Sequence, residues 1–195
     1  DNYRKFHNHQ IASDVYCHVL RDGPAISTYS FVGSSFKQMI QYAGKMLYVM
    51  TPYLILEEAM ISTLVEAANR GVDVRIVTPY IPDKKYVKYM TEYNYGILLK
   101  EGVRIYEYVP GFIHSKVIMN EHCAIVGTIN MDYRSFYLHY ENGVWVYDEA
   151  FQEAVFRDFT KTFEQCKEVT YEEWKNRPLS KKIKQSVLHL FDTLA

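Results

Sequence analysis

The sequence predicts an α/β fold with a mixed β-sheet that is flanked by helices on both faces. Between residues 46 and 108, apolar strand-like runs alternate with helical patterns, which is typical of parallel βαβ units. From residue 115 the next segments are short, β-like and joined by tight turns, which makes the sheet a mixed one. The length of 195 residues suits one compact domain.

Short apolar runs and turn residues define the first elements. Residues 15–20 form a strand pattern that ends at the turn signal Asp22-Gly23-Pro24. Residues 34–42 predict a short helix. Residues 46–50 predict an apolar strand, which Thr51-Pro52 closes.

The first βαβ unit continues from that strand. Leu56, Met60 and Leu64 recur at helical spacing, and Gly71 is placed to end the helix. Residues 72–78 then alternate between apolar and polar side chains, as in a strand. A strand, a helix and a strand in this order predict parallel pairing of the two strands.

The second unit repeats this order. Asp83 is expected to cap a helix that runs to about Lys100, and Gly102 is placed to end it. Residues 103–108 form the next strand pattern. The expected buried face of this helix consists of Tyr86, Met90, Tyr93 and Ile97.

The remaining elements are short strands followed by helices. Residues 115–119, 123–126 and 143–147 predict strands with little room for helices between them. Residues 148–167 predict a long helix and residues 179–194 a second one. The expected organisation is a linker-like segment at 1–14, a domain at 15–177 and a basic amphipathic helix at 178–195.

Composition excludes several classes of protein. Apolar residues make up 48% and charged residues 23%, as in a globular protein, and the net charge of −1 argues against a nucleic-acid partner. No apolar run reaches the ~18–20 residues of a membrane span, and the polar start is unlike a signal peptide. We therefore expect the domain as given to be soluble, which leaves open an anchor on a longer parent chain.

Cysteine usage and motifs predict neither a metal nor a cofactor. Cys17, Cys123 and Cys166 are odd in number and widely spaced, so we expect reduced thiols in a cytosolic compartment. The sequence contains no HExxH motif, no carboxylate cluster and no glycine-rich phosphate loop.

A histidine and a lysine two residues apart are the first candidates for chemistry. Side chains at positions i and i+2 of a strand point to the same side, so His114 and Lys116 are expected to project together. An imidazole can attack phosphorus or donate a proton, and an ammonium can neutralise a phosphoryl oxygen. The pair alone is a weak signal, because most His-x-Lys sequences have surface or packing roles.

The residues that follow make the signal stronger. From His114 the chain reads HSKVIMNEHCAIVGTINMDYRS, which resembles the HxKxxxxD…GSxN signature of the phospholipase D superfamily. His114 and Lys116 match the histidine and lysine of the motif, and Asn130 matches its phosphate-binding asparagine. Thr128 replaces the serine and keeps the hydroxyl, whereas Glu121 replaces the aspartate and adds a methylene.

The resemblance also implies roles for two glutamates. In the family the acid at Glu121 is mainly a structural support, and the alternative is a solvated charge in a hairpin turn. A catalytic histidine needs a partner on its second ring nitrogen, and the resemblance gives Glu141 that role. The alternative for Glu141 is a carboxylate on a surface strand, although its apolar neighbours favour burial.

The chain carries one such motif. Asp132, Arg134 and Ser135 also follow the family pattern, and we expect them to pin the loop. The remaining histidines lack a lysine two residues later and are expected to have surface or packing roles: His7, His9, His18, His122, His139 and His189.

Longer stretches are similar to one branch of the superfamily. YVMTPYLILEEAM and VGTINMDYRSFYLHYENGVWVYD look like the C-terminal catalytic domain of bacterial cardiolipin synthases. The resemblance implies a phosphatidyltransferase that uses phosphatidylglycerol as donor and acceptor, forms a phosphohistidine and releases cardiolipin and glycerol. It further implies a second phospholipase D half, from the parent chain or a second subunit, and a parent protein at the cytoplasmic membrane of a bacterium with this domain on the cytosolic side.

Two other functions stay open. A single-motif chain can form its site by two-fold pairing, as a homodimeric phosphodiesterase or nuclease. An isolated half-domain can also be catalytically silent and only bind lipid or a partner.

The C-terminal helix also has two interpretations. Leu179, Ile183 and Val187 lie at helical spacing beside Lys181, Lys182 and Lys184, which suits an anionic membrane surface. The alternative is a helix that docks on the domain with its lysines solvated.

Overall fold

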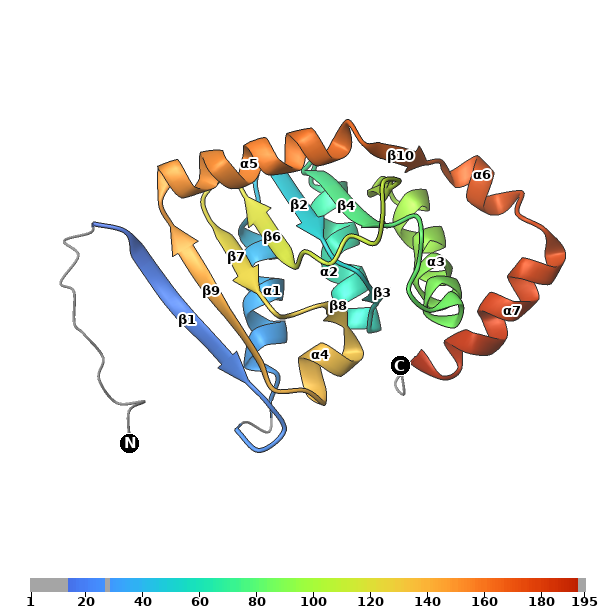
Figure 1. Ribbon diagram of the computed structural model, residues 1–195, viewed down its shortest axis with the longest axis horizontal. Coiled ribbons are helices and arrows are strands. Elements are labelled where there is room, and N and C mark those ends of the chain that lie inside the picture. The colour runs from blue at the N-terminus through green and yellow to red at the C-terminus, as the bar shows by residue number, and fades with distance from the viewer. Residues whose placement is uncertain (1–13, 27–28, 193–195) are drawn as a thin grey trace.

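An eight-stranded mixed sheet forms the centre of the computed structural model, which describes residues 14–26 and 29–192 (Figure 1). The expected linker at 1–14 lies almost wholly outside these residues. The strand order is β1-β9-β7-β6-β2-β4-β5-β10. These strands are β1 (Tyr16–Asp22), β2 (Met46–Met50), β4 (Asp73–Pro79), β5 (Arg104–Tyr108), β6 (Val117–Asn120), β7 (Ala124–Gly127), β9 (Glu141–Tyr147) and β10 (Cys166–Val169).

Helices cover both faces of this sheet, as the sequence predicts. The helices are α1 (Phe31–Tyr42), α2 (Glu58–Asn69), α3 (Lys85–Lys100), α4 (Tyr133–Tyr137), α5 (Glu149–Phe163), α6 (Tyr171–Lys175) and α7 (Leu179–His189). The larger core cluster packs α1, α2 and α3 against one face. On the opposite face α5 lies across the strands, where fully buried Phe159 contacts Tyr48 (Figure 1).

The two predicted βαβ units are confirmed. β2 pairs in parallel with β4, and β4 pairs in parallel with β5. Gly71 and Gly102 follow α2 and α3 with φ of 89° and 91°, a backbone conformation that favours glycine. The parallel strands therefore end at a common edge, where chemistry is usually found in such sheets.

The predicted face of α3 is only partly correct. Met90 is buried as predicted, but Tyr86 and Ile97 are about half exposed, and the buried side also includes Thr91 and Asn94. These two polar side chains hydrogen-bond the backbone of Leu54, at 3.2 Å and 3.0 Å. Apolar spacing therefore places part of the buried face incorrectly, because α3 uses polar groups to hold a neighbouring strand.

The start of α3 also differs from the prediction. The residue that precedes the helix is Lys84, which makes no side-chain cap. The carboxylate of Asp83 accepts hydrogen bonds from the Lys84 N–H at 2.7 Å and from the Tyr53 hydroxyl at 2.6 Å. Asp83 thus joins two loops and does not cap the helix.

The long helix predicted at 148–167 is too long. Asp148 caps α5 through the N–H of Phe151, but the helix ends at Phe163 and β10 follows. β10 pairs antiparallel with β5 and covers its outer edge, which satisfies the backbone groups there. The charged residues of β10 fit a helical pattern locally, so only the long-range pairing with β5 makes this segment a strand.

Two short elements near the motif, and helix α6 further along the chain, are not predicted by the sequence. β3 (Leu54–Ile55) pairs in parallel with β8 (Met131–Asp132) as a separate two-stranded sheet. α4 follows β8 directly, with Asp132 as its capping residue. Both elements position residues of the motif, as described below. Among the described residues, none of the helices is long and apolar enough to cross a bilayer.

Candidate active site

The β6–β7 hairpin brings the two parts of the motif together. Val117 of β6 pairs with Val126 of β7, and the Gly127 N–H donates to the Lys116 carbonyl at 3.3 Å. His114 and Lys116 lie in the extended segment just before β6, which begins at Val117 and not at the predicted residue 115. The sequence distance between Lys116 and Gly127 is therefore closed by one tight hairpin.

A glycine at position 127 lets β7 approach β9 closely. Gly127 pairs with Gly143, and a Cβ atom at Gly127 would collide with the carbonyl oxygen of Asn142. The next residue continues this contact, because the Thr128 N–H donates to the same carbonyl at 2.9 Å. Close approach of the two backbones fixes Thr128 against the first residues of β9.

Glu141 lies at that contact and is buried. Its carboxylate accepts a hydrogen bond from the Thr128 hydroxyl. Its other oxygen lies 3.7 Å from Nδ1 of His139. The Arg134 guanidinium donates to Nε2 of His139 at 2.7 Å, so Arg134, His139, Glu141 and Thr128 form one connected polar chain.

The Lys116 ammonium interacts electrostatically with the carboxylates of Glu141 and Asp132. Burial lowers the pKa of the Lys116 ammonium below its usual 10.5, and the charges of Glu141 and Asp132 oppose this effect. The Lys116 ammonium also donates to the His114 carbonyl at 2.7 Å. A half-buried ammonium that makes one hydrogen bond to a backbone carbonyl retains further N–H donors for an anionic ligand.

Asn130 and Asp132 are positioned by β8 and α4. The Met131 N–H donates to the Thr51 hydroxyl at 3.0 Å, which ties β8 to the end of β2. Burial raises the pKa of Asp132, opposed by hydrogen bonds from Ser135 and Asn130, and the Ser135 N–H donates to it at 2.6 Å. The Asn130 side-chain oxygen is buried without a hydrogen-bond partner among the described residues.

Four of the residues described above line a cleft of about 320 Å³. Asn130, Asp132, Arg134 and His139 come from one side of it. The opposite side is lined by Tyr53, Ile55, Lys84, Tyr86 and Val87. The cleft therefore combines a basic and polar wall with an apolar and aromatic one, which suits a ligand that has an anionic group on an apolar body.

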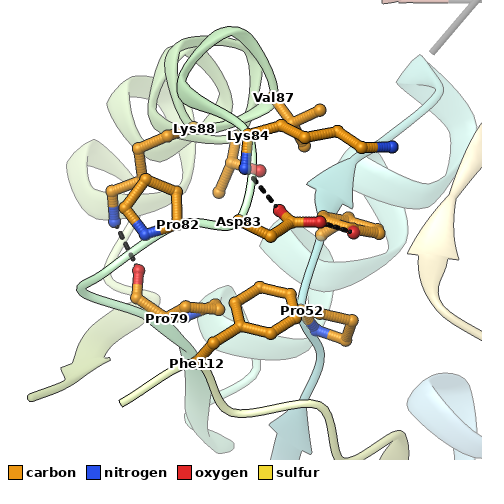
Figure 2. Close-up of a pocket in the computed structure, with 10 residues that line it drawn as sticks. Pro52, Pro79, Pro82, Asp83, Lys84, Val87, Lys88 and Phe112 are labelled. Carbon is orange, nitrogen blue, oxygen red and sulfur yellow. Dashed lines mark hydrogen bonds between the residues drawn. The ribbon is translucent and has the colours of Figure 1, made fainter. Parts of the chain in front are cut away.

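The ring of His114 lies beside the aromatic wall. It is exposed and packs against Phe112 at 5.6 Å between ring centroids, and Phe112 lies 6.3 Å from Tyr53. Figure 2 shows the small hollow that Phe112 and Tyr53 line together, with the Asp83 carboxylate bound to the Lys84 N–H and to the hydroxyl of Tyr53. Within the described residues, no hydrogen bond joins the His114 ring to Glu141.

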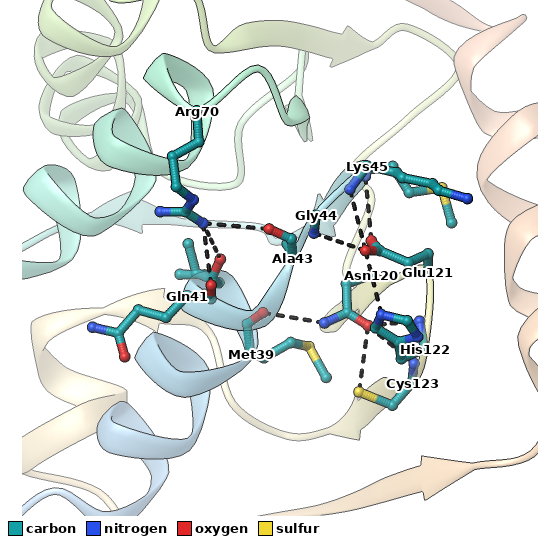
Figure 3. Close-up of polar contacts among 12 residues, drawn as sticks. Met39, Gln41, Ala43, Gly44, Lys45, Arg70, Asn120, Glu121, His122 and Cys123 are labelled. Atoms are coloured by element: carbon teal, nitrogen blue, oxygen red, sulfur yellow. Dashed lines mark hydrogen bonds and ion pairs between the residues drawn. The ribbon is translucent and has the colours of Figure 1, made fainter.

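Glu121 lies at the other end of the hairpin, away from the cleft. Its carboxylate accepts hydrogen bonds from the N–H groups of Gly44, Lys45 and Met46, at 2.7 Å, 3.2 Å and 3.4 Å (Figure 3). Burial alone would raise the pKa of Glu121, but these hydrogen bonds outweigh it and lower the pKa below the usual 4.5. Of the two interpretations, this geometry matches structural support and not a solvated charge.

Several cleft residues escaped sequence reasoning. His139 was assigned a surface or packing role, yet it is the link between Arg134 and Glu141. Tyr53 and Phe112 were not singled out at all. One signal was present: Tyr53 follows Thr51-Pro52 at the end of a parallel strand, the edge where ligands bind in such sheets.

A metal-ligand cluster is not found among the described residues. The described part of the chain contains no group of three His, Cys, Asp or Glu side chains that is able to hold a metal ion. The described cysteines are free, and Cys123 is buried, which raises the pKa of its thiol. The cleft instead offers an imidazole, an ammonium, an amide and a carboxylate.

The fold places the chain among proteins of the phospholipase D fold. Nuc from Salmonella typhimurium aligns with a TM-score of 0.67 at 18% identity, over 80% of this chain and 99% of that one. Phosphatidylserine synthase from Haemophilus influenzae aligns with a TM-score of 0.72 at 16% identity, over 92% and 46%. Likeness at such low identity defines the fold alone.

The particular family follows from the sequence comparison. Residues 36–167 match the family model described as cardiolipin synthase, PLD-like domain, and the chain belongs to this family. A Staphylococcus epidermidis protein named cardiolipin synthase 1 is 37% identical over 177 residues. A Geobacillus kaustophilus cardiolipin synthase is 39% identical over 157 residues. These matches cover 90% and 80% of this chain, but 36% and 31% of the relatives, so the chain spans about a third of their length.

Proposed function

We propose that the chain supplies one half of a cardiolipin synthase site, which transfers a phosphatidyl group between two phosphatidylglycerol molecules. The observation that carries this proposal is the junction of the β6–β7 hairpin with β9. There Lys116 lies opposite Gly127, and Asn130, whose buried side-chain oxygen has no partner among the described residues, lines the cleft. The proposed catalytic groups are His114, Lys116, Asn130 and Glu141.

The proposed reaction has two displacement steps at phosphorus. A histidine nitrogen attacks the phosphatidyl phosphorus, a P–N bond forms, and the P–O bond to glycerol breaks. The histidine of the other half donates a proton to the departing glycerol oxygen. That histidine then takes the proton from a hydroxyl of the second phosphatidylglycerol. The oxygen of this hydroxyl attacks the phosphorus of the phosphohistidine, a P–O bond forms, the P–N bond breaks, and cardiolipin and the free histidine result.

Each proposed role rests on a feature of the cleft. His114 is exposed, so its ring is accessible to a phosphoryl group. Lys116 and the Asn130 amide are donors for the phosphoryl oxygens, whose charge grows in the transition state. Glu141, buried and joined to Thr128, is the negative group that favours the charged form of its cationic neighbours.

Supporting roles fall to the residues around this set. Asp132 caps α4 and so fixes the loop that carries Asn130. Arg134 holds His139 against Glu141. The proposal includes a second phospholipase D half, from the rest of a longer chain or a second subunit, and a parent protein at the bacterial cytoplasmic membrane with this domain on the cytosolic side.

A chimera tests the proposal directly. The chain replaces the matching segment of the Staphylococcus epidermidis protein named cardiolipin synthase 1, and conversion of phosphatidylglycerol to cardiolipin is measured. We expect His114→Ala to lower the rate about a thousandfold. His122→Ala is the matched control, because His122 is an exposed histidine at the far end of the same hairpin.

Two outcomes would overturn the assignment. Cardiolipin formation by the His114→Ala chimera within about twofold of the unchanged chimera would remove the catalytic role of His114. The homodimeric alternative predicts that the isolated chain dimerises and hydrolyses a phosphodiester in a His114-dependent manner, while the chimera stays inactive on phosphatidylglycerol. A monomeric mass in solution would exclude that alternative.

A further inference from the structure

Helix α7 is attached to the domain by its polar side. Gln185 is fully buried and donates to the Glu92 carboxylate of α3 at 2.9 Å. The Lys181 ammonium pairs with the same carboxylate at 2.7 Å, and the ring of His189 stacks on Tyr93 at 4.0 Å. The contact with α3 therefore combines hydrogen bonds, an ion pair and ring stacking with the packing of Leu188 against the apolar cluster of Ile55, Val87 and Met90.

The apolar side of α7 and of the turn after it faces outward. The apolar residues at helical spacing are all more than half exposed: Leu179 72%, Ile183 56%, Val187 52%, Leu190 77% and Phe191 51%. This arrangement is the reverse of α5, which buries Phe159 completely against the sheet. A helix that keeps its polar side inward and an apolar stripe outward presents that stripe to another apolar phase.

The charges beside the apolar stripe indicate which apolar environment the stripe contacts. At about 100° per residue, Lys182 and Lys184 fall on opposite edges of the stripe. Residues 178–191 contain no aspartate or glutamate. On the Lys184 side, a groove of about 660 Å³ toward α3 is lined by five lysines and two glutamates. An apolar stripe between lysines is complementary to a bilayer with anionic headgroups.

We propose that α7 docks on the surface of an anionic phospholipid bilayer, with Leu179, Ile183, Val187, Leu190 and Phe191 in the interfacial region. Lys182 and Lys184 then lie at the level of the headgroup phosphates. The C-terminal end of α7 adjoins the cleft, because Ile55 lines both the cleft and the hollow that contains Leu190. Docking in this way brings the cleft next to the membrane surface.

Vesicle binding by the whole chain tests this proposal. We expect the chain to sediment with vesicles of phosphatidylglycerol and phosphatidylcholine, and about tenfold less with phosphatidylcholine alone. The double variant Ile183→Ser/Val187→Ser should weaken binding about tenfold. Tyr42→Ser is the control, because Tyr42 is also an exposed apolar side chain, at 69%, but lies at the end of α1.

A second pair of variants separates charge from apolar contact. Lys182→Gln/Lys184→Gln should also weaken binding to the anionic vesicles about tenfold and reduce its salt dependence. Lys45→Gln/Lys161→Gln removes two exposed lysines elsewhere and should leave binding unchanged. Circular dichroism checks whether each variant is folded. We expect each to be folded, because the substituted side chains lie at the surface.

Three results would overturn the proposal. These are equal binding to both kinds of vesicle, unchanged binding by the Ile183→Ser/Val187→Ser variant, and a dimer in solution that this variant dissociates. Membrane docking through α7 requires nothing of the chemistry at His114, so the vesicle assay and the chimera assay can fail separately.

Discussion

The two ends of the β6–β7 hairpin differ in how completely their polar groups are paired. At the turn, the Asn120 side chain donates to the Met39 carbonyl at 3.1 Å and accepts from the N–H groups of His122 and Cys123 (Figure 3). Glu121 accepts from the start of β2. At the open end, the His114 ring is exposed and the Asn130 oxygen has no partner among the described residues.

This difference separates two duties within one motif. The four residues of β6 span roughly 13 Å, so a carboxylate at Glu121 has no means of reaching a phosphoryl group beside Lys116. Polar groups at the turn are satisfied by the protein and hold α1, β2 and the hairpin together. Those at the open end retain donors and acceptors, which is what a ligand needs. We therefore expect substitutions at the turn to change stability and those at the open end to change activity.

The largest expected effect is at Lys116. Lys116→Met keeps the apolar stem and removes the charge, and in the chimera it should slow cardiolipin formation about a thousandfold, or ~4 kcal/mol in the barrier. The free energy of unfolding should change by less than about 0.5 kcal/mol. Lys45→Met, at an exposed lysine near the turn, is the control. If the free energy of unfolding of Lys116→Met fell by as much as its reaction barrier rose, the expected difference between the two ends of the hairpin would be contradicted.

The next effect is at Asn120, which is almost completely buried. Asn120→Ala leaves two backbone N–H groups and one carbonyl without partners, so we expect a loss of about 3 kcal/mol in the free energy of unfolding. The rate per folded molecule should not change. Asn142→Ala, at an exposed asparagine beside the cleft, should cost less than about 0.5 kcal/mol. Denaturant unfolding measures both variants, and equal losses would contradict the expectation.

The smallest effect concerns the charge of Glu121. Glu121→Gln keeps the shape but weakens the hydrogen bonds, so at pH 7 we expect a loss of about 1 kcal/mol. The pKa of Glu121 is lower in the folded protein than the usual 4.5, so its stabilising effect is complete above that pH. It disappears as the pH falls through the folded value.

Unfolding measured across pH checks this expectation. The stability difference between the unchanged chain and Glu121→Gln should be constant from pH 7 to about pH 5.5 and should shrink below pH 4.5. Glu153→Gln, on the exposed face of α5, provides the control. A difference that persisted undiminished at about pH 3 would mean that shape, and not charge, makes Glu121 stabilising.

Local patterns predict the fold where local interactions decide it. The alternating strands and the glycines at 71 and 102 produce the βαβ units, because periodicity and positive φ are properties of neighbouring residues. The prediction was wrong where a segment distant along the chain determines the secondary structure or the buried face. β10 is a strand because β5 has an open edge, and α3 turns polar residues inward because Leu54 has backbone groups to satisfy.

The candidate site also has a part that the local sequence predicts and a part that depends on long-range contacts. The motif at His114, Lys116 and Asn130 was visible as residue types at fixed spacing, since a single hairpin encodes it. The contribution of Tyr53, which lines the cleft, and of Phe112, which lies between Tyr53 and His114, was not visible, because these residues meet the motif only across the sheet edge. His139 was missed because its role depends on contacts with Arg134 and Glu141, which the folded chain alone brings together.

By itself, the sequence determined the class of fold, the residues and spacing of the motif and the amphipathic character of the C-terminal helix. Only the tertiary structure decided which side of that helix faces outward, because Gln185 and Lys181 find their partner in Glu92 of α3. It also decided that the acid at Glu121 binds the backbone before β2 while the acid at Glu141 is buried against Thr128. Sequence spacing fixes residue type and local periodicity, whereas burial and pairing depend on segments that are distant along the chain.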